Sequence, residues 1–114
     1  MKFRIKRVYE KPAKSDGKRI LVDRLWPRGM KKEDAKIDLW MKEIAPTTEL
    51  RKWFSHDRAK WKAFQEKYTR ELKKNKEQVD LLKEEIRKGM VTLVYAARDE
   101  ECNAAVVLQE YLNS

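Results

Sequence analysis

The sequence has little cysteine, histidine or glycine and no long apolar run. Cys102 and His56 are the only residues of their kind among 114, and there are three glycines. These counts exclude an intrachain disulfide, a zinc site of several cysteines and a glycine-lined phosphate loop, and no acidic cluster has metal-loop spacing. We therefore expect no metal and no cofactor. Because no segment resembles a membrane span or a signal peptide, we expect a cytoplasmic protein without a membrane partner.

Positive charge is concentrated in the N-terminal third of the chain. Residues 1–37 hold 13 lysines and arginines against 5 acidic residues, a net of +8, whereas residues 38–114 hold 15 against 14, a net of +1. A basic excess of this kind attracts phosphate groups, either on a nucleic acid or on a small anion. The same lysines can equally serve only to keep exposed strands and loops in water. Both interpretations stay open at this point.

Apolar patterns predict four strands. Period-two or continuous apolar runs indicate strands at 3–9, 19–26, 38–46 and 90–97. The third of these is ambiguous because its alternation is short, and we interpret it as a short strand that ends at Pro46. The fourth is the strongest, since it is compact, rich in β-branched residues and free of glycine and proline.

Capping signals and a three-to-four spacing of apolar residues predict about four helices. Thr47 or Thr48 can cap a brief helix, Asp57 begins one that runs to about residue 74, and Asn75 separates it from a third. Asp99 is predicted to cap the last helix. A strand entered from a helix and left into a helix indicates parallel pairing. We therefore predict one α/β domain over residues 1–114, with a single-layer sheet of three to four strands, partly parallel, packed by about four helices.

The stretch DRLWPRG at residues 23–29 follows an apolar strand with an acid, two arginines and an indole. By alternation we place Ile20, Val22, Arg24 and Trp26 on one face of that strand. Ligands in open α/β sheets bind outside the carboxyl ends of the strands. If the second and the last strands are neighbours, the polar residues after both converge on one site: Asp23, Arg24, Trp26, Arg28, Arg98, Asp99 and Asn103.

These residues suit the recognition of an anion. Arg24, Arg28 and Arg98 present planar, bidentate donors to a phosphate or carboxylate group. Trp26 offers a stacking surface for a base or a sugar, and Asn103 can form hydrogen bonds with an amide-like edge of a ligand. Trp26 can equally be interpreted as an anchor of the apolar core.

Three residues are candidates for proton transfer or nucleophilic attack. Asp23 and Asp99 could act as a general base or a nucleophile, and His56 is the only imidazole available for proton transfer. The structural alternatives are that Asp99 is a helix N-cap and that Asp23 pairs with an arginine. Glu100 and Glu101 follow Asp99 and would repel a phosphate bound at the start of that helix.

Five segments together resemble one family. VDRLWPRG (22–29), DLWMKEIAP (38–46), LRKWFSHD (50–57), WKAFQEKY (61–68) and TLVYAARDEECNAAVVL (92–108) closely resemble the YeaO-like proteins, small bacterial and archaeal members of domain-of-unknown-function family 488. The resemblance covers nearly the whole chain and implies an α/β fold with recurring residues at strand ends. The pair Asp23–Arg24 is similar to an Asp-x-Arg element of the family. Other branches have Cys-His-Arg after the late strand, where this chain has Asn103 nearby and lacks the triplet, and the resemblance implies no established activity.

Three classes of function follow from these observations. The first is an enzyme or a binding protein for a phosphorylated or nucleotide-like small molecule held by the strand-end arginines, and whether it is an enzyme stays open. The second is a nucleic-acid-binding, regulatory module that uses the basic N-terminal third. The third is a protein-interaction scaffold without a ligand. The sequence makes no prediction about oligomeric state.

Overall fold

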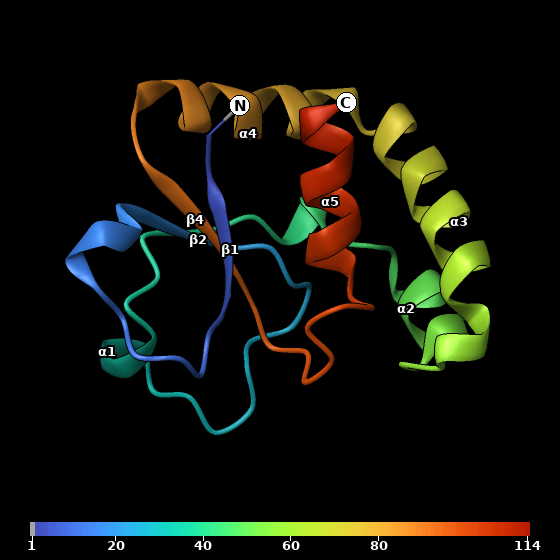
Figure 1. The fold of residues 1–114 in the computed structure, drawn as a ribbon, viewed down its shortest axis with the longest axis horizontal. Helices are drawn as coiled ribbons and strands as arrows, with labels where there is room; N and C mark the ends of the chain where they lie inside the picture. Colours follow the sequence, from blue (N-terminus) through green and yellow to red (C-terminus); the bar gives the residue numbers. More distant parts are fainter. Residues whose placement is uncertain (1) are drawn as a thin grey trace.

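A computed structural model of the chain, which describes residues 2–114, has an α/β fold built on one sheet (Figure 1). The strands are β1 (Arg4–Arg7), β2 (Lys18–Leu21), β3 (Leu39–Trp40) and β4 (Val91–Tyr95). The α-helices are α1 (Lys32–Ala35), α2 (Thr48–Phe54), α3 (Trp61–Lys74), α4 (Lys76–Lys88) and α5 (Ala104–Asn113), and three short 3-10 helices are η1 (Lys14–Asp16), η2 (Lys42–Ile44) and η3 (Arg58–Lys60). The predicted α/β class is confirmed.

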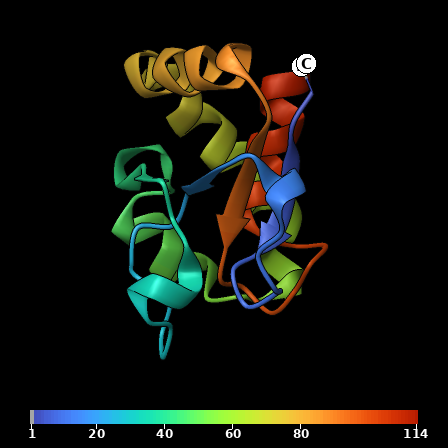
Figure 2. The ribbon, with the colours of Figure 1, turned by 90° about the vertical axis from the view of Figure 1, so that its left-hand side faces the viewer.

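The four strands are parallel and lie in the order β1-β4-β2-β3. Figure 2 shows β4 in the middle of the sheet, between β1 and β2. In the register of the central pair, Lys18 lies opposite Val91 and Leu21 lies opposite Val94. The sequence therefore predicted parallel pairing correctly, and the second and last predicted strands are neighbours.

All four predicted strands are longer than the observed ones, and the second and third differ most. β2 ends at Leu21 instead of residue 26, because the chain bends at Arg24 and leaves the sheet. β3 contains only two residues of the predicted 38–46 segment, and η2 follows it. Met41 and Ile44 are both buried, and their spacing of three residues fits a helical turn better than an extended strand.

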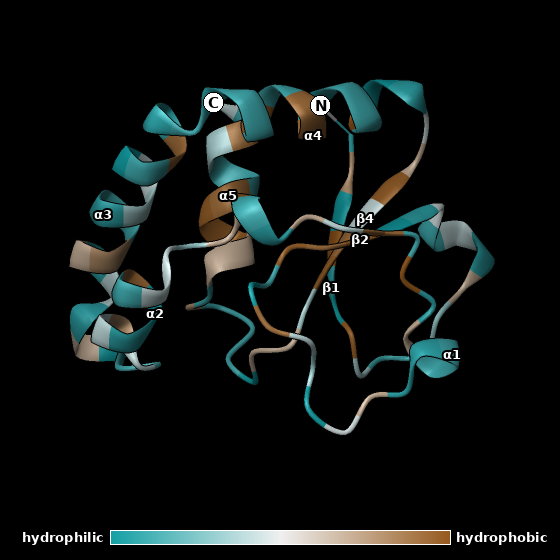
Figure 3. Ribbon diagram, turned by 180° about the vertical axis from the view of Figure 1, so that it is seen from behind, coloured by the Kyte–Doolittle hydropathy of each residue, from teal (hydrophilic) through white to brown (hydrophobic). Residues whose placement is uncertain are grey.

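Apolar side chains fill both faces of the sheet. On one face Ile20 and Leu93 join a large cluster with buried residues of α3, α4 and α5, and on the other face Leu21 and Val94 pack with Val8 and Ala35. Figure 1 shows α3 and α5 to one side of the strands and α1 to the other. Figure 3 shows the apolar character of β4 and the more hydrophilic outer surfaces of α3 and α4. Burial on both faces explains why the last strand is a continuous apolar run.

The helices begin and end mostly where the sequence indicates. Thr47 caps α2, since its hydroxyl oxygen accepts a hydrogen bond from the Leu50 N–H at 3.2 Å, and Asn75 separates α3 from α4. Asp57 accepts a hydrogen bond from the Ala59 N–H at the start of η3, which leads directly into α3. None of the helices described between residues 2 and 114 combines the length and apolarity needed for a bilayer span.

The predicted cap of the last helix is wrong. Asp99 accepts hydrogen bonds from the Glu101 and Cys102 N–H groups, so it closes a turn before the helix. The N-cap is Asn103, whose side-chain oxygen accepts a hydrogen bond from the Val106 N–H at 3.0 Å. Both aspartate and asparagine can cap a helix, and the competing turn at residues 99–102 moves the start of α5 to Ala104.

A buried ionic cluster joins the amino ends of the strands. Asp16 is 1% exposed and accepts hydrogen bonds from Arg19 at 2.7 Å and from Lys6 at 3.1 Å. Arg19 also donates two hydrogen bonds to the Ala35 carbonyl, and the Thr92 hydroxyl donates to the Asp16 carbonyl. Although burial by itself raises the pKa of Asp16, hydrogen bonds from Ala13, Lys6 and Arg19 together hold that pKa below its usual value. The cluster links β1, β2, β4 and α1.

Gly17 connects this cluster to β2 in a conformation that requires glycine. Its φ angle is +65°, and a Cβ atom at this position would lie 2.3 Å from the Met90 carbonyl oxygen. The same carbonyl accepts a hydrogen bond from the Lys18 N–H at 2.9 Å, which begins the pairing of β2 with β4. The close approach of two backbones at Gly17 therefore sets the register of the central strands.

The Asp16→Asn substitution is expected to lower the free energy of unfolding by about 3 kcal/mol, because it leaves the buried Arg19 and the adjacent Lys6 without a counter-ion. Urea denaturation at pH 7 measures the change. The matched control is Asp80→Asn, which removes an exposed carboxylate paired with Lys76 and should cost at most about 0.5 kcal/mol. Equal losses in the two variants would contradict a special role for the buried cluster.

Candidate functional site

The carboxyl ends of β2 and β4 lie side by side, as predicted from the sequence. Backbone pairing continues one residue past β2, since the Val22 N–H donates to the Val94 carbonyl at 3.1 Å. Beyond this point a side chain takes over, and the Ala96 N–H donates to Asp23 Oδ2 at 2.8 Å. The segments that follow the two strands are therefore held next to each other, although β2 itself has ended.

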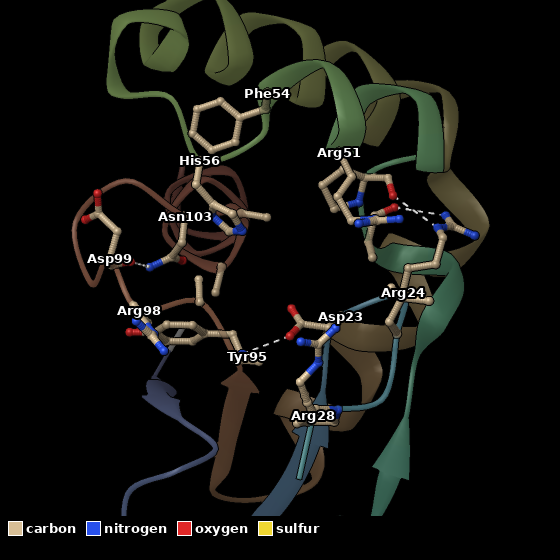
Figure 4. A pocket seen from close by; sticks show the side chains of 18 of the residues that line it. Asp23, Arg24, Arg28, Arg51, Phe54, His56, Tyr95, Arg98, Asp99 and Asn103 are labelled. Carbon is tan, nitrogen blue, oxygen red and sulfur yellow. Dashed lines mark hydrogen bonds between the residues drawn. The ribbon is translucent and has the colours of Figure 1, made fainter. Parts of the chain in front are cut away.

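A pocket of about 560 Å³ opens at these strand ends (Figure 4). Its wall includes residues from the ends of β2 and β4, from α2 and the residues after it, from α3, and from the start of α5. All eight residues predicted for the site line this one pocket: Asp23, Arg24, Trp26, Arg28, His56, Arg98, Asp99 and Asn103. The predicted convergence is therefore observed, whereas the chemical role of each residue stays a prediction.

One part of the wall is apolar and aromatic. Phe54 of α2 and Phe64 of α3 stack with ring centroids 4.2 Å apart, and both line the pocket together with Tyr95 of β4. Burial raises the pKa of the Tyr95 hydroxyl, and the nearby Glu100 acts in the same direction. Small side chains at Ala96 and Ala97 leave room beside the rings. This surface suits a flat or apolar portion of a ligand.

Three arginines line the pocket from three different parts of the chain. Arg28 follows β2, Arg51 lies in α2 and Arg98 follows β4, and all three are exposed. Within residues 2–114, none of their guanidinium groups makes a hydrogen bond or an ion pair with another residue. Figure 4 shows them spread around the pocket, with Arg51 beside α2 and Arg98 beside Tyr95. These groups remain available to an anion.

The loop that presents Arg28 is tied to the sheet edge. The Tyr9 hydroxyl, just beyond β1, donates a hydrogen bond to the Arg28 carbonyl at 2.8 Å, and Arg7 lies over the Tyr9 ring at 5.2 Å. Arg28 is therefore anchored through its backbone while its side chain is left free. This contact was invisible in the sequence because it joins residues 19 positions apart.

Arg51 was missed by the sequence reasoning. Its position three residues before Phe54 places the two side chains on the same side of α2, and the aromatic residue faces the pocket. The apolar spacing could have identified this face. It could not have shown that α2 lies next to the ends of β2 and β4, because that contact depends on how α2 packs against α3.

Arg24 is already engaged by the protein backbone. Its Nε donates to the Pro46 carbonyl and its Nη2 donates to the Ala45 carbonyl, both at 3.1 Å. Its Nη1 lies 3.8 Å from a carboxylate oxygen of Glu43. These contacts join the end of β2 to the segment that leads into α2, so Arg24 positions the wall of the pocket.

Trp26 lies on the opposite side of the sheet from the one predicted. The indole packs edge-on against Trp40 with centroids 5.5 Å apart and donates a hydrogen bond from Nε1 to the Met30 carbonyl at 2.8 Å. It thereby joins the smaller apolar cluster with Leu21, whereas Ile20 belongs to the larger one. Strand alternation does not extend to residue 26 because β2 ends at residue 21.

Asp23 is held at both its backbone and its side chain. Its carbonyl accepts a hydrogen bond from Trp40 Nε1 at 2.7 Å, and its Oδ2 accepts the bond from Ala96. Its Oδ1 accepts no hydrogen bond from residues 2–114, and within the same residues no arginine forms an ion pair with it. The predicted pairing of Asp23 with an arginine is therefore wrong, because backbone contacts hold Arg24 away.

The environment of Asp23 changes its acidity. Burial raises the pKa of this carboxyl to about 6, and the hydrogen bond from Ala96 and the nearby His56 only partly oppose the effect. Figure 4 shows His56 and Asp23 reaching into the pocket from opposite walls. A carboxyl that titrates close to neutral pH inside a pocket is a common property of functional sites.

His56 reaches the pocket through an unusual backbone. Ser55 ends α2 with a φ angle of +45°, and His56 follows with a φ angle of +56°. Such left-handed conformations in residues other than glycine cost on the order of 1 kcal/mol each and are frequent at functional sites. The two consecutive residues reverse the chain between α2 and η3 and turn the imidazole toward the pocket (Figure 4).

Asp99 has a full set of internal partners. Arg58 donates two hydrogen bonds to its carboxylate, at 2.8 and 2.9 Å, in addition to those from the Glu101 and Cys102 N–H groups. The Cys102 N–H and then the Arg58 guanidinium lower the pKa of Asp99 to about 2. Such a carboxylate is a weak base, so this geometry favours a structural role for Asp99 over the predicted catalytic one.

The Asn103 side chain also forms hydrogen bonds with the nearby backbone. Its side-chain oxygen caps α5, and its side-chain nitrogen donates to the Asp99 carbonyl at 2.8 Å. It therefore fixes the turn that presents Arg98 and Asp99. Across residues 2–114, no group of three or more histidine, cysteine or acidic side chains is arranged to hold a metal ion.

Comparisons with known proteins place the chain among relatives of the same length. A family profile described as the inactive DUF488-N3 subclade matches residues 2–114. The uncharacterised protein YeaO of Escherichia coli strain K12 is 45% identical over 114 residues, which cover 100% of this chain and 99% of that protein. The uncharacterised protein Mb3100c of Mycobacterium bovis is 38% identical over 112 residues, 98% of this chain and 94% of that protein. No solved structure gives a significant match.

The raised pKa of Asp23 predicts a pH-dependent stability. Between about pH 4 and pH 6 the folded chain keeps a proton on Asp23 that the unfolded chain has lost, so the free energy of unfolding falls as the pH rises through this window. The Asp23→Asn substitution removes this titration. Between pH 4 and pH 7 the free energy of unfolding of the wild type should therefore fall by on the order of 1–2 kcal/mol relative to that of the variant.

Urea denaturation at several pH values measures this difference, with Asp80→Asn, which removes an exposed carboxylate, as the matched control. Repeating the comparison in a His56→Asn background separates the contribution of the nearby imidazole. If the difference between wild type and Asp23→Asn stayed constant from pH 4 to pH 7, Asp23 would titrate as an ordinary aspartate.

Proposed function

The chain belongs to the DUF488-N3 subclade described as inactive, and from this membership and the pocket we propose that it binds a phosphorylated or nucleotide-like small molecule without converting it. The observation that carries the proposal is the presence of three guanidinium groups without internal counter-ions around one pocket. A cytoplasmic location is part of the same proposal.

The charge of the pocket favours an anion. Arg28, Arg51 and Arg98 bring three positive charges, and of the two carboxylates in the pocket wall Asp99 is neutralised by Arg58. Asp23 is the other, and the three arginines outnumber this single carboxylate. Guanidinium groups bind phosphate oxygens with two parallel hydrogen bonds, which makes arginine well suited to this ligand class.

The shape of the pocket favours an anion with an attached ring or apolar group. Its volume of about 560 Å³ lies within the range of roughly 300–1,000 Å³ that is typical of small-molecule sites. Phe54 and Phe64 contribute an apolar part of the wall although they are only 5% and 2% exposed, and inorganic phosphate alone would leave this part of the pocket without a ligand contact. A ligand that fills the pocket therefore combines a charged end with a less polar body.

Binding explains the arrangement better than catalysis does. Asp99 is held as a weak base by Arg58, and Arg24 and Asn103 make their contacts within the protein. Asp23 and His56 remain candidates for proton transfer, and the catalytic role predicted for them stays a prediction. The description of the subclade as inactive supports the choice of a binding protein.

Nucleic-acid binding is the weaker alternative. Part of the basic excess in residues 1–37 has internal partners: Lys6 and Arg19 bind Asp16, and Arg24 binds backbone carbonyls. Arg28 lines the pocket. The remaining lysines support the weak, sequence-independent attraction that any basic surface has for phosphate, and this alternative stays a prediction.

A thermal-shift and calorimetric panel tests the proposal. Inorganic phosphate, phenyl phosphate and nucleoside monophosphates are titrated into the wild type, and ring-bearing phosphates should raise the melting temperature more than phosphate alone. Arg28→Ala and Arg98→Ala should each weaken binding by roughly tenfold or more, because each removes a charged hydrogen-bond donor. Arg70→Ala on α3, which lies outside the pocket wall, removes the same charge and should leave binding within about twofold.

The same samples are examined for chemical change of the bound probe. An unchanged probe after prolonged incubation fits the proposed binding role, and turnover that depends on Asp23 or His56 would replace it with the catalytic one. If no phosphate-bearing probe shifts the melting temperature, or if Arg70→Ala weakens binding as much as Arg98→Ala does, the proposed site is wrong.

A further inference from the structure

The pocket contains an acceptor that the proposed anion does not use. Asp23 Oδ1 has no hydrogen-bond donor within residues 2–114, although the other atoms of the residue are fixed by the Ala96 N–H and by Trp40 Nε1. The orientation of the carboxyl group is therefore set before any ligand arrives. A fixed acceptor that opens into a pocket is suited to a donor on the ligand.

The arginines of the pocket do not neutralise this carboxyl. Four guanidinium groups line the same wall, yet within residues 2–114 none of them forms an ion pair with Asp23. Arg24 is held by the Ala45 and Pro46 carbonyls. Figure 4 draws the Arg28 side chain next to Asp23, although within residues 2–114 no hydrogen bond or ion pair joins the two, and it draws Arg51 and Arg98 farther from the carboxyl. Positive and negative groups thus remain unpaired in one cavity, and the cavity is complementary to a molecule with both an anionic end and a donor end.

Apolar groups line the same cavity as these two kinds of group. Phe54 and Phe64, which are only 5% and 2% exposed, form an aromatic part of its wall, and Ala96 and Ala97 add small side chains. Planar heterocycles bind well to aromatic side chains, and their ring N–H and amino groups are strong donors to a carboxylate. The donor end of the ligand and its flat part can therefore be the same group.

We infer that the ligand is a phosphorylated nitrogen heterocycle, such as a nucleoside monophosphate, whose ring N–H or amino group donates a hydrogen bond to Asp23 while its phosphate is held by the arginines. This inference rests on the proposed function and names the class of ligand for that site. Asp23 is then a specificity-determining residue, and the arginines supply affinity for the phosphate.

The inference is tested with nucleotides that have or lack a ring donor, of which the adenosine nucleotide and its donor-free analogue differ by the amino group alone. Adenosine, guanosine and cytidine 5′-monophosphates are compared at pH 7.5 with purine riboside 5′-monophosphate, which keeps a purine ring and the phosphate but has no N–H or amino donor on the ring. Isothermal titration calorimetry with the full chain measures each dissociation constant. The wild type should bind at least one of the three natural bases about tenfold or more tightly than the donor-free analogue.

The Asp23→Asn variant provides the second comparison, because asparagine keeps the size of the side chain and an oxygen acceptor for the Ala96 N–H. It should bind the donor-free analogue as well as the wild type does and should lose most of the preference for the natural base. Asp80→Asn, whose carboxylate is exposed on α4, should keep the preference in full. If Asp23→Asn does not fold, the comparison of the natural nucleotides with the donor-free analogue on the wild type still tests the inference.

The possible outcomes separate the two proposals. If the donor-free analogue binds as tightly as every natural base, or if Asp23→Asn keeps the preference, the inference about Asp23 is wrong while the phosphate site stands. If neither the natural bases nor the analogue binds, the proposed function itself fails. If the wild type prefers a natural nucleotide to the donor-free analogue and only Asp23→Asn loses this preference, both the proposed function and the inference about Asp23 are supported.

Discussion

The parallel pairing of β2 with β4 is the constraint on which the rest of the structure depends. At the amino ends the pairing is fixed by the contact of Gly17 with Met90 and by the hydrogen bond from Thr92 to Asp16, and at the carboxyl ends it is extended by the bond between Asp23 and Ala96. Because both strands point the same way, every residue that leaves the sheet after them does so at one edge. The pocket exists because two segments about 70 residues apart in the chain leave the sheet together, as the span of 73 residues between Asp23 and Ala96 illustrates.

Charge is divided among three uses in this chain. Lys6 and Arg19 bind the buried Asp16 next to the start of β2, where burial of the carboxylate makes it depend on these partners. Arg24 and Arg58 bind carbonyl and carboxylate oxygens that shape the pocket wall. Arg28, Arg51 and Arg98 line the cavity without such partners within residues 2–114. A net charge counted along the sequence cannot distinguish these uses, since the distinction lies in which oxygen each side chain reaches.

The sequence predicted the fold class, a partly parallel sheet where the observed one is wholly parallel, and the group of residues around the pocket, because these follow from apolar patterns and from a general property of parallel sheets. It failed where a local pattern competes with a tertiary contact. The chain bends at Arg24 and leaves the sheet after β2, and this places Trp26 on the unexpected face. The turn closed by Asp99 shifts the helix cap to Asn103. Arg51 was not predicted because the packing of α2 beside the strand ends leaves no sign in its own sequence.

The left-handed backbone at Ser55 and His56 has a consequence for how this protein could change. At two other positions with positive φ angles the chain has glycine, at Gly17 and Gly29, and there the conformation carries no steric penalty. At residue 56 it has a histidine, so a glycine there would relieve local strain and remove the imidazole in a single step. Directed evolution for heat resistance alone would therefore tend to exchange His56 for glycine, and a library selected in that way would reveal whether thermal robustness and ligand recognition are opposed at this residue.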